Sequence, residues 1–241
     1  MINILSQPYL VLDQYLDVEK FDSIIDDIIL GIAKSRYATG PANTGTGYLD
    51  KSKHSAFEIY RSILADSTHP YYEIIKNLKN WEPFTFIQYK WPSHVLGQCL
   101  LLRGSGIDAY ESKHNPSYCR DHPIISNFTS FVNWLTSTNI FEFIGRIVIF
   151  LNETGSSVLE HRDYQDGVSK KDQFIWICPM GNKKFYVRDG DNKVYFNSRF
   201  CYFDNANIHG SDIIEQSSFS IRVDGKFSQS FLDKTNLKHH I

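Results

Sequence analysis

The sequence lacks most of the features that mark a secreted protein, a membrane protein or a protein stabilised by a structural metal site. Its four cysteines are widely scattered and none forms a C-x-x-C pair, which argues against a structural zinc site or a disulfide-rich scaffold. No stretch reaches the roughly 20 apolar residues of a membrane-spanning helix. The start of the chain also lacks the basic segment and the long apolar run of a signal peptide. We therefore expect a cytoplasmic protein without a membrane partner.

An excess of charge of one sign is missing as well. Lys and Arg total 25, Asp and Glu total 27, and the net charge is −2, with both signs interspersed along the chain. Binding to a phosphate backbone requires a concentrated basic face, so nucleic acid is not an expected partner. With 241 residues and 42% apolar composition, the chain can bury one sizeable core, and we predict a single domain over residues 1–241. The oligomeric state stays open.

Residues 1–144 have mainly helical patterns. Four segments carry apolar residues at the three- and four-residue steps of one helix face, namely Asp17–Ala33, residues 57–64, residues 72–78 and Ile124–Leu135. Two strand-like runs, Phe84–Tyr89 and Gln98–Arg103, lie between them. Because each helix has an apolar face, the helices need a surface to cover. Residues 1–144 are therefore predicted to be helical support with two additional strands.

Beyond Gly145 the pattern changes to short strands separated by turn residues. The expected strands are Arg146–Asn152, Val158–Asp163, Gln173–Cys178, Lys184–Arg188, Lys193–Phe196, Arg199–Phe203, Ile208–Ile214 and Phe219–Asp224. Such closely spaced strands are typical of a jelly-roll or cupin-like barrel. We predict a mainly β fold with flanking α-helices, in which residues 145–227 form the barrel core and residues 228–241 a tail.

The first and last strands of this core each have two different faces. In the last strand, alternation puts Ile221 and its apolar neighbours on one face and Ser220, Arg222 and Asp224 on the other. The first strand alternates in the same way, with Asn152 on its mixed face. We expect the helices to cover the apolar faces and the mixed faces to line a polar pocket.

Two histidines and an aspartate have the order of a metal site. His161 and Asp163 are two residues apart, so on one extended strand their side chains leave from the same face. His209 follows 48 residues later (209 − 161), which allows several strands to bring it back beside them. Two imidazoles and one carboxylate form the facial arrangement of non-haem Fe(II) oxygenases. We expect His161, Asp163 and His209 to bind the metal at the catalytic centre; coincidental placement among nine histidines is the alternative.

Arg222 lies 13 residues beyond His209 (222 − 209). A guanidinium is costly to bury without an anion, and its planar fork matches a carboxylate, so we expect Arg222 to bind the carboxylate of a cosubstrate. A structural ion pair is the alternative role. Ser220 shares this face and is a candidate hydroxyl donor to the same ligand, unless it bonds to the neighbouring backbone. Asn152 is a third candidate contact, with strand-end capping as its alternative.

Three motifs together resemble one enzyme superfamily. They are Leu159-Glu160-His161-Arg162-Asp163, Phe203-Asp204-Asn205-Ala206-Asn207-Ile208-His209-Gly210 and Ser220-Ile221-Arg222-Val223-Asp224-Gly225. Their order and spacing resemble the Fe(II)- and 2-oxoglutarate-dependent oxygenases over about residues 145–227, and the second and third motifs are similar to the aspartyl/asparaginyl β-hydroxylase-like branch. The resemblance implies a double-stranded β-helix in which His161, Asp163 and His209 bind Fe(II) and Arg222 binds the distal carboxylate of 2-oxoglutarate.

The same resemblance implies a reaction but no substrate. Enzymes of this kind use O₂ to convert 2-oxoglutarate to succinate and CO₂ while they hydroxylate an unactivated C–H bond. A cupin-like metalloenzyme that does not use 2-oxoglutarate and a non-catalytic barrel that only binds a ligand are the alternatives. The oxidised substrate can be a small molecule, a glycan precursor or a protein side chain, because substrate contacts lie on loops whose conformation the sequence does not fix.

Overall fold

The computed structural model of the chain describes a set of segments that together contain the barrel core. They are residues 8–35, 65–68, 72, 98–104, 113–152, 157–163, 172–180, 184–216, 218–235 and 237. The strand expected over Phe84–Tyr89 and the helix expected over residues 57–64 lie outside these segments, as does all but Tyr72 of the helix expected over residues 72–78. No helix in the described segments is long and apolar enough to cross a membrane.

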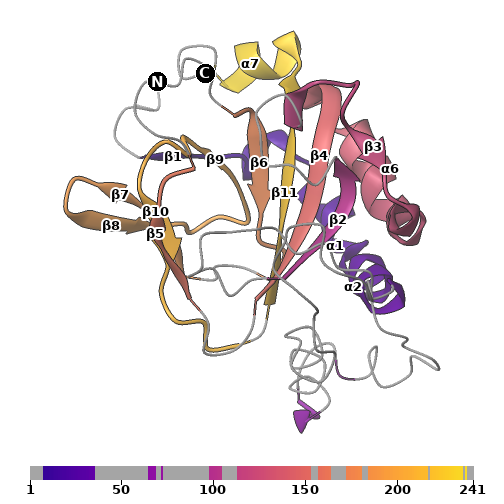
Figure 1. The fold of residues 1–241 in the computed structure, drawn as a ribbon, viewed down its shortest axis with the longest axis horizontal. Helices are drawn as coiled ribbons and strands as arrows, with labels where there is room; N and C mark the ends of the chain where they lie inside the picture. Colours follow the sequence, from indigo (N-terminus) through magenta and orange to yellow (C-terminus); the bar gives the residue numbers. More distant parts are fainter. Residues whose placement is uncertain are drawn as a thin grey trace.

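The described strands form two antiparallel sheets that face each other (Figure 1). The larger sheet contains, in order, β1 (Tyr9–Val11), β9 (Phe200–Phe203), β6 (Phe174–Ile177), β11 (Ser218–Phe227), β4 (Phe141–Asn152), β2 (Gln98–Gly104) and β3 (Arg120–Asp121). The smaller sheet contains, in order, β5 (Val158–His161), β10 (His209–Ser211), β7 (Phe185–Asp189) and β8 (Asn192–Tyr195). Each of the eight strands predicted beyond Gly145 coincides with one of these, with shifted ends.

The strands from β4 to β11 have the connectivity of a jelly roll. With β4 counted as the first and β11 as the eighth, the larger sheet contains them in the order 6-3-8-1 and the smaller sheet in the order 2-7-4-5. Apart from the β7–β8 pair, neighbours among these eight strands are not consecutive in the sequence, as expected for a double-sheet jelly roll. The predicted fold, mainly β with flanking helices, is confirmed.

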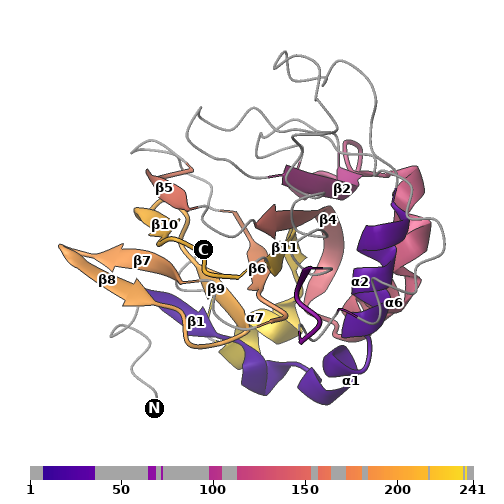
Figure 2. The same ribbon diagram turned by 90° about the horizontal axis from the view of Figure 1, so that it is seen from below.

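Helices cover the outer face of the larger sheet (Figure 2). They are α1 (Val18–Asp22), α2 (Ile25–Lys34) and α6 (Thr129–Ser137), the last preceded by the 3₁₀ segment η4 (Pro123–Phe128). A further 3₁₀ turn, η2 (Asp13–Tyr15), precedes α1, and α7 (Gln229–Thr235) follows β11. The helix expected over Ile124–Leu135 therefore begins as a 3₁₀ segment.

The single helix expected over Asp17–Ala33 is wrong, because the chain breaks it between α1 and α2. The Ser23 hydroxyl donates to the Lys20 carbonyl at 2.7 Å, a side-chain bond that competes with helix hydrogen bonding. The amide of Ile24 donates to the Phe21 carbonyl three residues back, and Ile24 leaves the helical region with φ −113° and ψ 1°. The apolar periodicity passes through this break unchanged, which is why the sequence does not reveal it.

The register of the larger sheet explains which face the helices cover. One row of directly paired residues crosses four strands as Ile149, Ile221, Ile177 and Phe200. The Phe200 ring contacts Phe21 of α1 and Trp134 of α6, with ring centroids 4.9 Å and 5.9 Å apart. Paired residues share a face of the sheet, so the apolar face of β4 and β11 lies under the helices, as the sequence predicts.

The adjacent row points the other way, into the space between the two sheets. It consists of Val148, Arg222, Trp176 and Cys201. The Trp176 ring stacks on Phe185 of the smaller sheet, with ring centroids 5.2 Å apart. Arg222 therefore points toward the jelly-roll interior, on the face where the sequence places it.

Trp134→Ala tests how far stability depends on this helix-to-sheet contact. The ring is fully buried against Phe21 and Phe200, and its Nε1–H donates to the Asp17 carbonyl at 3.1 Å. We expect the free energy of unfolding, measured by urea denaturation, to fall by about 3–5 kcal/mol. Tyr118→Ala, at a side chain that is 53% exposed, is the control and should change it by less than about 0.5 kcal/mol. If Trp134→Ala lowers the free energy of unfolding no more than Tyr118→Ala does, the helices do not stabilise the larger sheet through this contact.

Candidate metal centre

The smaller sheet brings the two predicted histidine ligands together. β5 and β10 are neighbours, and His209 is the direct register partner of His161. β5 ends at His161, so the expectation that Asp163 lies on the same strand is wrong. Asp163 sits in a bend just beyond the strand, where its amide donates to the Asn205 carbonyl at 3.0 Å. This bond to the loop before β10, and not strand alternation, holds Asp163 beside the histidines.

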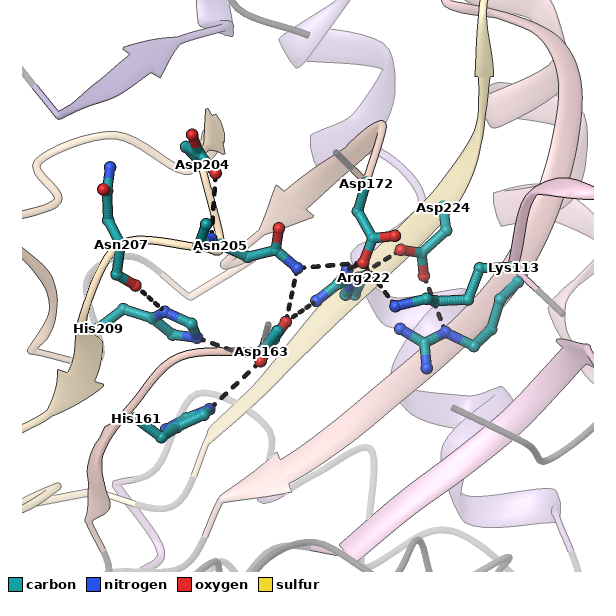
Figure 3. Close-up of polar contacts among 12 residues, drawn as sticks. Lys113, His161, Asp163, Asp172, Asp204, Asn205, Asn207, His209, Arg222 and Asp224 are labelled. Carbon is teal, nitrogen blue, oxygen red and sulfur yellow. Dashed lines mark hydrogen bonds and ion pairs between the residues drawn. The ribbon is translucent and has the colours of Figure 1, made fainter. Parts of the chain in front are cut away.

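The three side chains converge on one point (Figure 3). Asp163 Oδ1 lies 3.5 Å from His161 Nε2 and 3.6 Å from His209 Nε2, and one ligand atom from each residue lies within 4.8 Å of the other two. Ligand atoms held about 2.1 Å from a common ion at right angles are about 3 Å apart. Two nitrogens and one oxygen at the observed spacing therefore fit one divalent cation after small side-chain movements.

A hydrogen bond to the ring nitrogen that points away from Asp163 fixes the orientation of His209. Its Nδ1 lies 2.8 Å from the Asn207 carbonyl, which can only accept a hydrogen bond. Nδ1 therefore carries the proton, and in the neutral ring the lone pair is on Nε2, the atom that faces Asp163. Metal-binding histidines are held in this way by an acceptor on the far nitrogen.

The two oxygens of Asp163 have different partners. Oδ1 faces the histidines, whereas Oδ2 accepts hydrogen bonds from Arg222 Nη1 at 2.9 Å and Asn205 Nδ2 at 2.7 Å. These donors leave Oδ1 as the oxygen turned toward the metal position, in the way that a metal-binding carboxylate is oriented by its neighbours. Asn205 was not predicted as a site residue; its place in the turn between β9 and β10, four residues before His209, is the signal that points to it.

The electrostatic environment favours the ionised form of Asp163. Burial by itself raises the pKa of this carboxyl, but the neighbouring His161 and His209 rings and the charge of Arg222 outweigh burial and hold the pKa well below its usual range. Burial lowers the pKa of Arg222, and the charges of Asp224 and Asp172 more than offset this, so its pKa is raised above the ordinary value. Asp163 is thus an anion at neutral pH, as a metal ligand must be.

Arg222 joins the triad to a group of buried charges, which we call the charge cluster. It consists of Asp163, Asp172, Asp224, Lys113, Arg146 and Arg222, whose side chains are at most 10% exposed. Arg222 Nη2 donates to Asp172 at 2.6 Å and Nε to Asp224 at 2.8 Å. Lys113 reaches Asp172 at 2.5 Å and Arg146 reaches Asp224 at 2.8 Å (Figure 3). Every carboxylate of the cluster is thus paired with a cation.

The inference that a buried Arg222 needs an anion from outside the chain is wrong. Asp163, Asp172 and Asp224 each accept from a different nitrogen of its guanidinium. The binding of a cosubstrate carboxylate by Arg222 stays a prediction. Ser220 is fully buried on the same face of β11, two residues from Arg222, and the side chain of Asn152 lies outside the described part of the chain.

Lys113 and Asp172 of the charge cluster escaped prediction. Asp224 alternates with Arg222 on β11, so the period of two residues already places both on one face. Lys113 and Asp172 lie outside the strands, where no periodicity marks them. A Cβ on Gly145 of β4 would lie 1.7 Å from the Lys113 carbonyl oxygen, so only glycine lets the segment that carries Lys113 approach the sheet this closely.

A second set of side chains in the described segments has metal-binding atoms within reach of one another. It consists of His114, Asp172 and Asp224, whose ligand atoms also lie within 4.8 Å. Both carboxylates are already paired with cations of the charge cluster, namely Lys113, Arg146 and Arg222. A metal ion there would be repelled by three buried positive charges at close range. The His161, Asp163 and His209 triad is therefore the better metal site.

No protein-family model matches the chain, and no curated protein matches its sequence. Its fold is similar to solved structures of 2-oxoglutarate-Fe(II) oxygenases and of RmlC-like cupins. A Pseudomonas putida prolyl-4-hydroxylase is 9% identical, with a TM-score of 0.40, over 93% of this chain and 94% of that chain.

Two further structures match over shorter lengths. The viral collagen prolyl hydroxylase of Paramecium bursaria chlorella virus 1 is 12% identical, with a TM-score of 0.32, over 55% of this chain and 80% of that chain. An RmlC-like cupin from Desulfovibrio desulfuricans is 15% identical, with a TM-score of 0.25, over 33% of this chain and 70% of that chain. Similarities at this level leave the reaction and the substrate unassigned.

His209→Ala tests the metal centre directly. We expect the purified protein to bind one Mn(II) per chain in calorimetric titration, and the variant, which loses one of three ligands, to bind it at least about 100-fold more weakly. His122→Ala, at a histidine outside the triad, is the control and should leave binding unchanged. Equal affinity in the two variants would remove His209 from the ligand set.

Proposed function

We propose that this chain is an Fe(II)- and 2-oxoglutarate-dependent oxygenase that hydroxylates an unactivated C–H bond, with release of succinate and CO₂. The observation that carries the proposal is the convergence of His161 Nε2, His209 Nε2 and Asp163 Oδ1 in a jelly roll, beside a buried arginine. Fe(II) held by these three atoms would supply redox chemistry with O₂.

The charges around the triad support a dianionic cosubstrate. The three aspartates and three basic residues of the charge cluster carry formal charges of −3 and +3, which cancel. A divalent ion at the triad adds two positive charges to a buried site, where unbalanced charge costs several kcal/mol. 2-Oxoglutarate carries two negative charges at neutral pH. Its binding together with the metal would restore neutrality, whereas a neutral cosubstrate would not.

The chain's own residues orient the metal ligands and limit the access of water. Arg222 and Asn205 hold Asp163, and the Asn207 carbonyl holds His209. The guanidinium of Arg222 lies over the Phe174 ring, 4.0 Å from its centroid, which further shields its charge from solvent. The side chains of His161 and Asp163 are 12% and 10% exposed, against 4% for His209, so the triad opens to solvent on the His161 side. We infer that the substrate approaches there.

One observation favours a second candidate, a cupin-like metalloenzyme that does not use 2-oxoglutarate. The guanidinium of Arg222 already bonds to three carboxylates of its own chain. Such an arginine can act solely to hold Asp163 in place, which requires no external carboxylate. The two candidates differ in one property that can be measured, the binding and consumption of 2-oxoglutarate.

Succinate formation tests the proposed reaction. With Fe(II), ascorbate and O₂, we expect the protein to convert 2-oxoglutarate to succinate even without a primary substrate, and His209→Ala to reduce the rate at least about 100-fold, because the metal is lost. Lys193→Met is the control: this lysine pairs with Asp212 at 2.6 Å, away from the triad, and its loss should not change the rate. Metal-bound protein that forms no more succinate than His209→Ala would favour the cupin-like alternative.

The oxidised substrate is a separate question. Small metabolites, glycan precursors and peptides are the three classes to supply in this assay. A gain of one oxygen in the mass spectrum of one class, accompanied by faster succinate formation, would identify it.

A further inference from the structure

Three donors in the charge cluster converge on a single oxygen atom. Asp172 Oδ2 accepts from Lys113 Nζ at 2.5 Å, from Arg222 Nη2 at 2.6 Å and from Asn205 Nδ2 at 3.0 Å. We infer that the Asp172 side chain occupies the subsite of the distal carboxylate of a dicarboxylate cosubstrate, and that Lys113 and Asn205 hold that carboxylate, alongside Arg222, once the cosubstrate displaces Asp172. The inference rests on the proposed function.

The number and geometry of the donors support this reading. A carboxylate oxygen has two lone pairs, so three donors on Oδ2 exceed what one oxygen can accept in good geometry. The other oxygen of Asp172 faces His114, with Oδ1 3.6 Å from Nδ1. A ligand that presents both of its carboxylate oxygens to the three donors would satisfy them better than Asp172 does. Two of the donors are cations, which favours an anionic ligand over a neutral one.

The position of the subsite suits a cosubstrate that also reaches the metal. Asn205 and Arg222 each bond to Asp163 Oδ2 as well as to Asp172 Oδ2. The proposed subsite therefore adjoins the carboxylate that faces the histidines, on its far side from them (Figure 3). A dicarboxylate bound at the triad through one end has a cationic site for its other end next to Asp163.

Asp172 can turn away from the donors without disturbing the larger sheet. It precedes β6 and forms no strand pair, so turning its side chain breaks no sheet hydrogen bond. The exchange replaces one carboxylate by another, so Lys113 and Arg222 stay paired with an anion throughout. Breaking the pairs without replacement would instead remove one anion from two buried cations, which is unfavourable.

Asp172→Asn is the decisive variant, and glutarate is the probe. Glutarate has two carboxylates but no keto group, so its binding to metal-free protein in the presence of a chelator reports on the carboxylate subsite alone. The variant keeps the shape of the side chain but weakens the competitor for the three donors. We expect calorimetric titration to show glutarate binding at least about tenfold tighter than in the wild type, and at least about tenfold weaker in Lys113→Met.

Asp224→Asn is the matched control. It removes the same negative charge from the same cluster, but Asp224 contacts Arg222 Nε and Arg146 and accepts none of the three hydrogen bonds to Asp172 Oδ2. If the affinity for glutarate rises clearly more in Asp172→Asn than in Asp224→Asn, the result supports the subsite. Equal tightening in both variants would overturn it, because the change in net charge would then account for the effect.

Two further outcomes would also overturn the inference. Weaker glutarate binding in a folded Asp172→Asn variant would mean that Asp172 holds the donors in place and does not compete with the ligand. If Asp172→Asn fails to fold, Lys113→Met still decides, since unchanged glutarate binding in that variant excludes Lys113 from the subsite. Either result can coexist with succinate formation by the wild type, so failure of the subsite is distinguishable from failure of the proposed reaction.

Discussion

The hydrogen bond from Arg222 to Asp163 is the interaction on which the site depends. It crosses the interior from β11 of the larger sheet to the bend that follows β5 of the smaller sheet, at 2.9 Å between side chains that are 4% and 10% exposed. Without this bond a buried aspartate would face two histidines with less compensation for its charge, and a buried arginine would lose one of three anions. Each partner thus makes the burial of the other tolerable.

Because of the same bond, the two oxygens of Asp163 face different partners. Oδ2 is held by Arg222 and Asn205, and Oδ1 is left facing the imidazoles. The orientation of a metal ligand is therefore set by residues that also belong to the charge cluster. Because that cluster is neutral, a divalent ion at the triad makes the interior positive, and an anionic ligand is the simplest compensation. The binding of a metal and the binding of a dicarboxylate would in this way be electrostatically linked.

Much of this arrangement follows from strand periodicity. Alternation along β11 separates Ile221, which faces the helices, from Arg222, which faces the interior, and the register of the sheets agrees. The strand that begins at His209 does return beside His161. These features are predictable because side chains alternate between the two faces of a strand. A register shift of one residue would turn the apolar side chains away from the core.

The features that the sequence does not reveal depend on contacts distant in the chain. Asp163 reaches its place through a bend bonded to Asn205, and the break before α2 arises from local hydrogen bonds of Ser23 that leave the apolar pattern intact. Lys113 and Asp172 lie outside the strands and meet only because the fold brings them together, 59 positions apart. No spacing rule connects such residues, so their pairing with Arg222 became visible only in three dimensions.

The proposed site requires Asp163 to be shared between a metal ion and Arg222. Anomalous diffraction from crystals grown without O₂ in the presence of Mn(II) and 2-oxoglutarate tests it most directly. We expect one strong peak about 2.0–2.3 Å from His161 Nε2, His209 Nε2 and Asp163 Oδ1, with Oδ2 still bonded to Arg222. A peak among His114, Asp172 and Asp224, or an Asp163 turned away from the metal, would contradict it.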